Sequence, residues 1–473
     1  MQTQKNSNIA AGLDIPYYLA AVAPTILFVT VLTLNGFSGV TTAFAFHSLA
    51  VALGVFWLVL CLAIQYGVTL VGILRYGSPR EHDRRNLTVL REHGWDNDKR
   101  LVLCYVSQGI QQEVLAHSVK AAIEVAKRLN VTYEIEIVVD TVPLTDPFFG
   151  LEGCQIVNVP RSFKTPHGSC FKARSLCYAA STRAERIGSL ESAWVLHCDE
   201  DTVITDTSIA GIAEFLRHPR SSHICGAGEI KYNAQIFGLQ NIFSIIDCHR
   251  TGEDLGRFRL QFLSKQAAIT GVHGSFFVVP AKLESDIQFD FGPRGSITED
   301  IYFAFRLREL AVPYRWIHGH VREQSPQDLR NFLNQRSRWI HGLLNVCGDT
   351  RFSLLNRLVL FGYLAILRTT IVSVFALTIL LCAIPCSPAV HVLWQLSMMV
   401  VGTNVLVGLI RNIQNEKTMS PVLQAITVAV GISLVPVICL LETVAMVIGL
   451  LFRRDQFFVT TKTCRSWSYQ GKS

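Results

Sequence analysis

The sequence predicts a multi-pass membrane protein that holds one α/β domain between two sets of apolar helices. Three observations predict this fold class. Half of the 473 residues are hydrophobic and only 17% are charged, whereas soluble domains carry about 25% charged residues. The apolar residues gather toward the two ends of the chain. The polar middle alternates short apolar strands with amphipathic helices, which is typical of a parallel sheet with helices on both faces.

The two apolar ends predict the membrane spans. Residues 1–75 contain two uncharged stretches, 17–34 and 43–74, and about 20 apolar residues suffice to cross a bilayer. We expect two transmembrane helices here, the first a signal anchor, because no small-residue cleavage site stands out. Residues 352–452 predict a C-terminal bundle of three or four segments, with Pro436 breaking the last stretch in two.

One acidic residue inside the predicted bundle needs a partner. Glu442 is costly in lipid unless it is paired or faces a polar cavity. Arg368 belongs to the same apolar region. We therefore expect Arg368 and Glu442 to lie close together.

The distribution of charge predicts which side of the membrane the middle domain faces. The formal net charge is +7, and arginines follow both the second apolar stretch and the last one: Arg75, Arg80, Arg84, Arg85 and Arg91, then Arg453 and Arg454. Since such residues favour the cytoplasmic side, residues 76–327 and the tail 453–473 are expected in the cytosol. The arginines are not interleaved with aromatic residues, so membrane lipids are the expected partners and nucleic acid is not.

The middle domain places acidic residues where two predicted strands end. We expect strands at 100–106, 133–140, 192–199 and 223–230, and helices at 113–130 and 171–188. Asp140 and Asp199 are the last residues of their strands. In open α/β sheets the ligand crevice lies at the carboxyl ends of the strands. Residues 249–265 show no strand pattern and are expected to form a helix or a loop over this crevice.

The stretch "HCDEDTVITD", residues 197–206, crowds several acids directly after a buried strand. If the strand geometry continues, Asp199 and Asp201 point to one face and Glu200 turns away. Two hard carboxylates on one side suit Mg²⁺ or Mn²⁺. A solvated acidic turn is the structural alternative.

The stretch "GSITEDIYFAFRLREL" predicts the start of a helix. Ser296 and Glu299 have the Ser-x-x-Glu spacing of a capping box, in which the two side chains satisfy backbone groups at the helix N-terminus. Asp300 then has no capping role. A carboxylate held at a helix start beside a crevice can serve as a general base.

Residues 328–351 predict an interfacial amphipathic helix just before the C-terminal bundle. On this helix Gln335, Arg338 and Trp339 share one face, because they lie three and four positions apart. One interpretation is anchoring at the lipid headgroups. The other is a phosphate-binding guanidinium beside an aromatic platform for a sugar ring.

The order of these motifs resembles that of processive-type family 2 glycosyltransferases, which include cellulose, chitin and hyaluronan synthases. An acid after the second strand is followed by DxD, a Gly-Ser stretch ("GVHGSFF"), "TED", "QRSRW" and then membrane spans. The stretches "EDLGRFRLQF" and "GSITEDIYFAFRLRE" are more specifically similar to egghead-type β-1,4-mannosyltransferases.

The resemblance implies a GT-A (Rossmann-like) cytosolic glycosyltransferase domain inserted between transmembrane helices. It implies an integral membrane protein of a bacterial inner membrane, or of an ER or Golgi membrane if eukaryotic. Matching positions give nucleotide-sugar contacts, metal ligands, a catalytic base and acceptor contacts. These are Asp140, Lys172, Asp199 and Arg338 for the nucleotide sugar; Asp199 and Asp201 for the metal; Asp300 as base; and Gly274, Ser275, Gln335 and Trp339 for the acceptor.

The resemblance also implies the substrates. The expected reaction is transfer of mannose from GDP-mannose, with Mg²⁺ or Mn²⁺ as cofactor, in β-1,4 linkage to a lipid-linked or membrane-proximal glycan acceptor. A processive β-polysaccharide synthase that also translocates its polymer is the main alternative. A transporter or receptor with a metal-sensing cytosolic domain is a different class, and it would have no need of the "TED" and "QRSRW" motifs.

Overall fold

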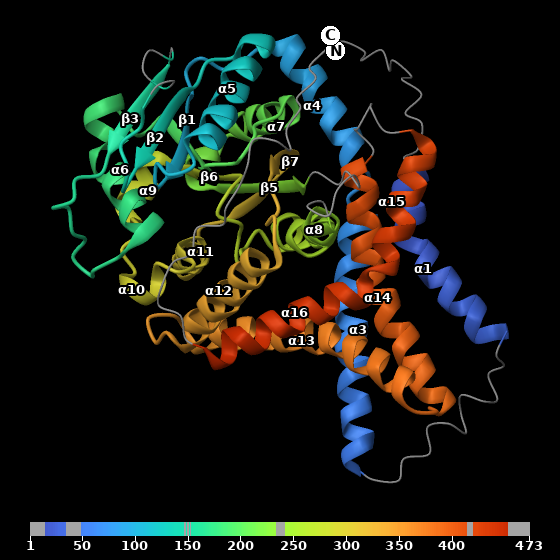
Figure 1. Cartoon of the computed structure of the whole chain (residues 1–473). Helices are drawn as coiled ribbons and strands as arrows, with labels where there is room; N and C mark the ends of the chain where they lie inside the picture. The colour runs from blue at the N-terminus through green and yellow to red at the C-terminus, as the bar shows by residue number, and fades with distance from the viewer. Residues whose placement is uncertain are drawn as a thin grey trace.

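A seven-stranded mixed sheet forms the centre of the middle domain (Figure 1). The computed structural model describes residues 15–34, 49–145, 148, 151, 153–232, 242–413 and 420–452. The strand order is β3-β2-β1-β4-β6-β5-β7. The strands are β1 (Arg100–Ser107), β2 (Glu134–Val139), β3 (Cys154–Asn158), β4 (Ala193–Asp199), β5 (Cys225–Tyr232), β6 (Phe277–Pro280) and β7 (Tyr314–Glu323). The predicted tail 453–473, with Arg453 and Arg454, lies outside the described residues.

One strand departs from the predicted parallel arrangement. β1 to β4 pair in parallel, and so do β5 and β7, but β6 is antiparallel to both β4 and β5. Phe277 at the start of β6 pairs with His197 near the end of β4. The chain therefore enters β6 from the carboxyl edge of the sheet, without a crossover helix, and a strand that enters from this edge must run antiparallel.

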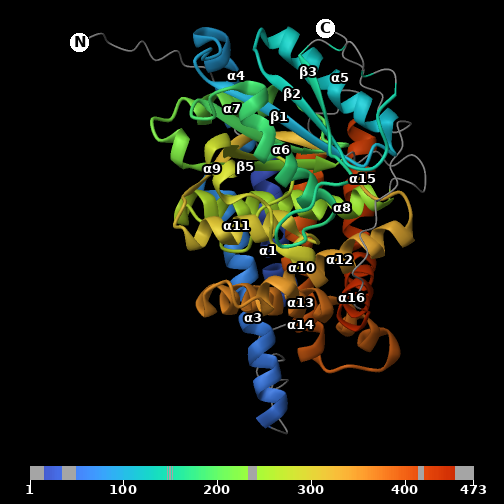
Figure 2. The ribbon, with the colours of Figure 1, turned by 90° about the vertical axis from the view of Figure 1, so that its left-hand side faces the viewer.

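Helices cover both faces of the sheet (Figures 1 and 2). They are α4 (Pro79–His93), α5 (Gln112–Leu129), α6 (Phe171–Ile187), α7 (Asp206–Leu216), α9 (Ala281–Ile287) and α11 (Glu299–Glu309). The four-residue helix α10 (Gly292–Gly295) lies just before α11 in the chain. Side chains of β1 alternate between two cores. Leu103 packs in the core with α5 and α7, whereas Val102 packs in the core with α6 and α11. Burial on both faces explains why the predicted strands are continuously apolar.

The apolar helices stand beside and beneath this domain. They are α1 (Ile15–Leu34), α3 (Leu49–Arg75), α13 (Leu354–Ala383), α14 (Pro388–Ile413), α15 (Pro421–Ser433) and α16 (Val435–Leu451). Within the described residues, Ala52–His93, α13 and α14 are long and apolar enough to cross a membrane, and α15 with α16 forms a further pair bent by 49°. The break falls at Leu434, two residues before Pro436. Figure 1 shows α13 and α16 running crosswise to α3.

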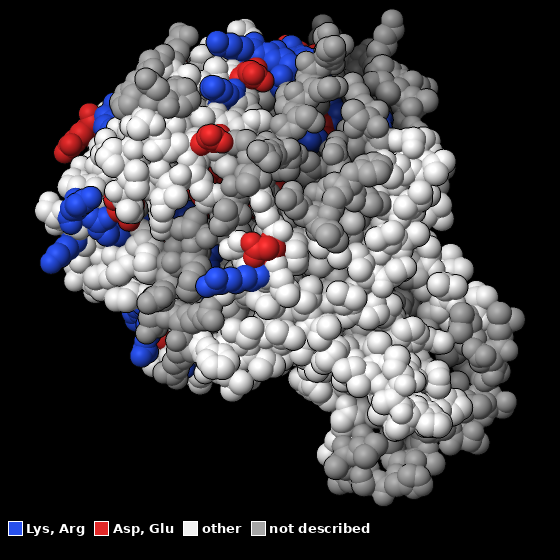
Figure 3. All heavy atoms as spheres, in the orientation of Figure 1, with Lys and Arg blue, Asp and Glu red and all other residues white. Residues whose placement is uncertain are grey.

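The surface reflects this division. In Figure 3 the Lys, Arg, Asp and Glu side chains are scattered over the sheet domain, whereas the face of the apolar helices at lower right carries almost none. Large apolar side chains are exposed along these helices, among them Phe56, Leu355 and Phe361. Such a surface is suited to contact with lipid.

A set of helices links the sheet domain to the apolar helices. These are α8 (Ile242–Glu253), the π-helical turns η3 (Asp254–Phe258) and η4 (Gln261–Lys265), and α12 (Leu329–Gly348). Residues 249–265 therefore form helix, one of the two predicted outcomes. On α12, buried Arg336 forms an ion pair with Glu442 of α16 at 2.9 Å, and Arg368 of α13 lies 3.1 Å from the same carboxylate. The expected pairing of Arg368 with Glu442 is confirmed.

Candidate active site

A cavity of about 310 Å³ joins the carboxyl edge of the sheet to the apolar helices. Its sheet end is lined by Ser107, Asp140 and Asp199. Its other end is lined by residues of α13 and α16, including Leu367 and Glu442. Polar groups at the edge of the sheet therefore share one continuous space with groups at the predicted membrane surface.

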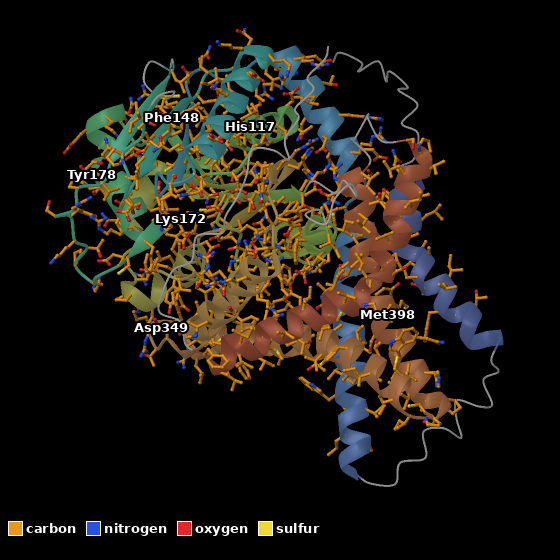
Figure 4. All side chains as sticks on the ribbon, in the orientation of Figure 1. His117, Phe148, Lys172, Tyr178, Asp349 and Met398 are labelled. Atoms are coloured by element: carbon orange, nitrogen blue, oxygen red, sulfur yellow. The ribbon has the colours of Figure 1, made fainter. Side chains whose placement is uncertain are left out.

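Lys172, in the first turn of α6 and labelled in Figure 4, lies among the charged side chains that line this cavity. Its Nζ lies 2.6 Å from Asp199 Oδ1 and 3.4 Å from a carboxylate oxygen of Glu299. It also donates to the carbonyl of Gly274 at 3.2 Å. Burial opposes the charge on Lys172, but the two carboxylates outweigh it and raise the pKa of the amine. The amine is therefore a fixed positive charge in the cavity.

Asp140, the predicted nucleotide contact, lines the cavity and forms an ion pair with Arg174. Burial raises the pKa of its carboxyl group, and Arg174 opposes this shift. The sequence interpretation missed Arg174. Its position, two residues after Lys172 at the start of the same helix, is the signal that could have indicated it.

The "DED" stretch does not continue the strand, so the predicted alternation of its side chains is wrong. β4 ends at Asp199, and Thr202 N donates to Asp199 O at 3.0 Å to close a turn. Asp199 and Glu200 both line the cavity, and Glu200 accepts a hydrogen bond from Ser107 Oγ at 2.7 Å. Asp201 is only 1% exposed, and its Oδ2 accepts from Gln324 N at 2.9 Å.

These positions bear on the predicted metal. Among the described residues, no group of three or more His, Cys, Asp or Glu side chains is arranged to hold a metal ion. Asp199 is 39% exposed at the cavity wall. Mg²⁺ usually takes one or two carboxylates together with substrate phosphates and water. Asp199 therefore fits as a protein ligand of an ion that arrives with a diphosphate, whereas Asp201 would have to leave its buried backbone partner.

The predicted capping box is also wrong. Thr298 is the N-cap of α11 and makes no side-chain capping bond. Ser296 Oγ instead donates to Gly292 O at 2.9 Å and accepts from Cys170 N at 2.8 Å. Glu299 is consequently free of capping and turns toward Lys172. The local spacing was compatible with a cap, but the short helix α10, which ends just before Ser296, takes up its hydroxyl.

Asp300, the predicted base, lies in the first turn of α11 and lines the cavity. Burial, followed by the negative charge of Glu299, raises the pKa of its carboxyl group to about 7, although Lys172 opposes the shift. A Cβ added to Gly274 would lie 3.1 Å from Asp300 Oδ2. The absence of a side chain at Gly274 leaves the carboxylate room at the cavity wall.

The three residues of the "QRSRW" motif that were predicted to share a face all line the cavity. Burial lowers the pKa of the Arg338 guanidinium, an effect that the nearby acids Glu299, Asp199 and Asp300 oppose. Trp339 is already in contact with cations, because the guanidinium groups of Arg250 and Arg336 lie 4.5 and 4.4 Å from its ring centroid. A sugar that stacks on Trp339 would have to share the ring with these guanidinium groups or displace one of them.

The Gly-Ser loop before β6 contributes to the cavity wall both residues that were predicted from the sequence and one that was not. Gly274 and Ser275 line the cavity. The hydroxyl of Ser275 donates to Glu323 of β7, which leaves it buried within the protein. His273 was not singled out from the sequence, yet it lines the cavity and its Nε2 lies 2.5 Å from Asp254 Oδ1.

Comparison with known proteins finds a family whose model matches part of this chain. Residues 194–409 match the model of the family described as glycosyl transferase family group 2. Together with the mixed sheet, this match confirms the predicted GT-A-type α/β fold. Residues 194–409 are therefore similar to the family 2 glycosyltransferase domain.

The chain is also similar to two curated proteins that are named β-1,4-mannosyltransferases. The chain is 28% identical over 310 residues to the β-1,4-mannosyltransferase bre-3 of Caenorhabditis elegans, covering 65% of this chain and 66% of the relative. It is 28% identical over 313 residues to the β-1,4-mannosyltransferase egh of Drosophila melanogaster, with the same coverage. The matched region thus spans just under two thirds of the length of these relatives.

Two solved structures are distantly similar. Mannosyl-3-phosphoglycerate synthase from Rubrobacter xylanophilus is 12% identical, with a TM-score of 0.33, over 59% of this chain and 86% of that one. The structure of S. aureus TarS 1-349 in complex with UDP is 12% identical, with a TM-score of 0.29, over 68% and 94%. At these values neither structure informs the function of the site.

Proposed function

We propose that this protein is an inverting glycosyltransferase that transfers mannose from GDP-mannose, in β-1,4 linkage, to a sugar-bearing acceptor at the membrane. The observation that carries the proposal is the single cavity in which Asp300, Lys172 and Arg338 meet and which continues to α13 and α16. The names of the curated relatives, both β-1,4-mannosyltransferases, support mannose as the donor sugar and the β-1,4 linkage.

The sheet end of the cavity is the proposed donor site. Asp140 lies at the carboxyl edge, where it would contact the nucleoside. Lys172 and Arg338 bring positive charge to the diphosphate, and the planar fork of Arg338 can bind two of its oxygens at once. A Mg²⁺ or Mn²⁺ ion bound to the diphosphate would be held by Asp199 and would supply further positive charge to the leaving group.

Asp300 is the proposed base. Its pKa of about 7 means that the carboxylate can take a proton at neutral pH without binding it irreversibly. It removes the proton from the acceptor hydroxyl as that oxygen forms a bond to the anomeric carbon. The bond from this carbon to the diphosphate oxygen breaks on the opposite side, and its electron pair leaves with GDP. GDP-mannose is α-linked, so attack from the opposite side gives a β product.

The other end of the cavity supports an acceptor that is presented by the membrane. Leu364, Leu367 and Ile371 of α13 line it, and α13 is long and apolar enough to span a bilayer. An acceptor sugar on a lipid could reach Asp300 through this end while its apolar part remains among the helices. The arginines after the second apolar stretch support a cytosolic catalytic domain.

The test is a donor and product assay on the full chain in detergent. GDP-mannose, GDP-glucose and UDP-sugars are offered with octyl glycosides as acceptors, and the Asp300→Asn variant serves as the blank. We expect consumption of GDP-mannose and one added β-1,4-mannose, identified by mass and NMR. A ladder of products that differ by one sugar each would support the processive synthase instead, whose polymer would leave through the end of the cavity at the apolar helices. Consumption no faster than in the blank would refute the proposal.

A further inference from the structure

We infer that His273 binds the acceptor sugar, that its Nδ1 accepts a hydrogen bond from a hydroxyl next to the attacking one, and that Asp254 sets this polarity. The inference rests on the proposed function and deepens it, because it assigns a residue that selects the acceptor. The sequence interpretation gave no role to either residue.

The hydrogen bonds of Asp254 determine which ring nitrogen of His273 carries the proton. Asp254 is 1% exposed, and its Oδ2 accepts from the backbone N–H of Ile230 at 3.1 Å. Its Oδ1 lies 2.5 Å from His273 Nε2. A carboxylate can only accept hydrogen bonds. Nε2 must therefore carry the hydrogen and donate it to Asp254.

This arrangement leaves one hydrogen-bonding atom of the ring for a ligand. A neutral imidazole has one donor and one acceptor nitrogen. With Nε2 as the donor, Nδ1 is the acceptor. The side chain of His273 is 19% exposed and lines the cavity, and its ring packs at 4.6 Å, between centroids, against Phe258. His273 thus offers a hydrogen-bond acceptor in a fixed orientation.

The loop that carries His273 is held on both sides. Gln261 Nε2 donates to the carbonyl of Gly271 at 3.1 Å, and the carbonyl of Gly274 accepts from the buried lysine amine at 3.2 Å. Gly274 follows His273 directly, and a Cβ there would lie 3.1 Å from Asp300 Oδ2. A sugar whose hydroxyl reaches Asp300 Oδ2 therefore lies close to Gly274, the residue next to His273.

The proposed linkage identifies the hydroxyls concerned. In β-1,4 transfer the 4-hydroxyl of the acceptor sugar loses its proton to Asp300. The nearest other hydroxyls of a hexose are those on C3 and C6. One of them is placed to donate to His273 Nδ1, and this contact would distinguish acceptors that differ at that carbon.

The first experiment measures this contact in the full chain in detergent. GDP-mannose is the donor, and the probes are the octyl β-glycoside that the protein uses and its 3-deoxy and 6-deoxy forms. We expect one deoxy form to lower kcat/KM roughly tenfold, as for loss of one hydrogen bond to a buried partner. His273→Ala should lower kcat/KM for the parent glycoside by a similar factor and show no further loss with the deoxy form.

The second experiment reverses the polarity of the imidazole. In Asp254→Asn the amide oxygen must accept from the Ile230 N–H, so the amide nitrogen faces His273 Nε2 and donates to it. Nδ1 then carries the hydrogen. A deoxyfluoro analogue cannot donate a hydrogen bond but can accept one. It should behave like the deoxy form in the wild type and recover relative to it, about threefold or more, in Asp254→Asn.

The controls separate acceptor recognition from structural damage. Asp290→Asn changes the corresponding hydrogen bond to the exposed His167, 2.9 Å away and outside the cavity, and should leave the acceptor preference unchanged. GDP-mannose affinity and thermal stability should stay near wild type in His273→Ala. A wild type that transfers no mannose to any octyl glycoside would refute the proposed function. Active wild type with equal rates on parent and deoxy forms, or equal analogue preferences in wild type and Asp254→Asn, would overturn the role of His273 alone.

Discussion

The raised pKa of Asp300 leads to a quantitative prediction for the pH dependence of transfer. The base must be deprotonated to act, so activity should be lost as the pH falls through about 7. With one group titrating at this value, the active fraction is about 0.1 at pH 6 and about 0.9 at pH 8, a roughly tenfold rise in kcat/KM. Initial rates of GDP release from the full chain in detergent, with acceptor below KM, measure this profile.

Two neighbouring substitutions identify the group responsible. Asp300→Asn should lower kcat by about 100-fold or more and remove the pH dependence, while GDP-mannose affinity stays near wild type. Glu299→Gln removes a negative charge that raises the pKa of Asp300, so the midpoint of the profile should move to lower pH with activity retained. The reasoning is refuted if Asp300→Asn keeps the wild-type profile, or if Glu299→Gln moves the midpoint to higher pH.

Three further predictions address the donor site, the acceptor site and the link to the apolar helices. EDTA should abolish transfer and Mn²⁺ or Mg²⁺ restore it, and Asp199→Ala should weaken GDP-mannose binding in calorimetry; full activity in chelator would exclude the metal. Trp339→Ala should raise the acceptor KM, whereas Arg338→Lys should lower kcat because the planar fork is lost; equal loss of donor affinity, acceptor use and stability in both would indicate simple anchoring. Arg336→Leu leaves buried Asp247 without its ion-pair partner and leaves Glu442 with Arg368 alone, and it should cost about 3–5 kcal/mol of stability, measured by thermal unfolding, whereas the exposed Arg330→Ala on the same helix should cost little.

Much of the site was predictable because its signals are local. Asp140 and Asp199 lie where two predicted strands end, and this position predicts a ligand-binding edge of the sheet. The structure brings both residues into one cavity. The shared face of Gln335, Arg338 and Trp339 follows from helical spacing alone, and all three line that cavity. The apolar ends indicated helices that are long and apolar enough to cross a membrane for the same reason, since hydrophobicity over a 20-residue window needs no knowledge of the fold.

Two predictions were wrong because the local sequence pattern was compatible with more than one structure. The spacing of Ser296 and Glu299 fits a capping box, but the short helix α10 takes up the serine hydroxyl and leaves Glu299 to face Lys172. The alternation of side chains in "DED" required the strand to continue. The chain turns after Asp199 instead, and this turn buries Asp201 against the end of β7.

The sequence by itself determined the order of the elements, the α/β class of the middle domain and the residues at the carboxyl edge of the sheet. Apart from the pairing of Arg368 with Glu442, only the tertiary structure decided which charges meet. Arg336 pairs with Glu442, which lies 106 residues away in the sequence. His273, in the loop before β6, contacts Asp254, which belongs to η3. The antiparallel course of β6 was decided in the same way. Periodicity depends on neighbours along one helix or strand, whereas these pairings depend on how whole elements pack, and no spacing within a single segment records that packing.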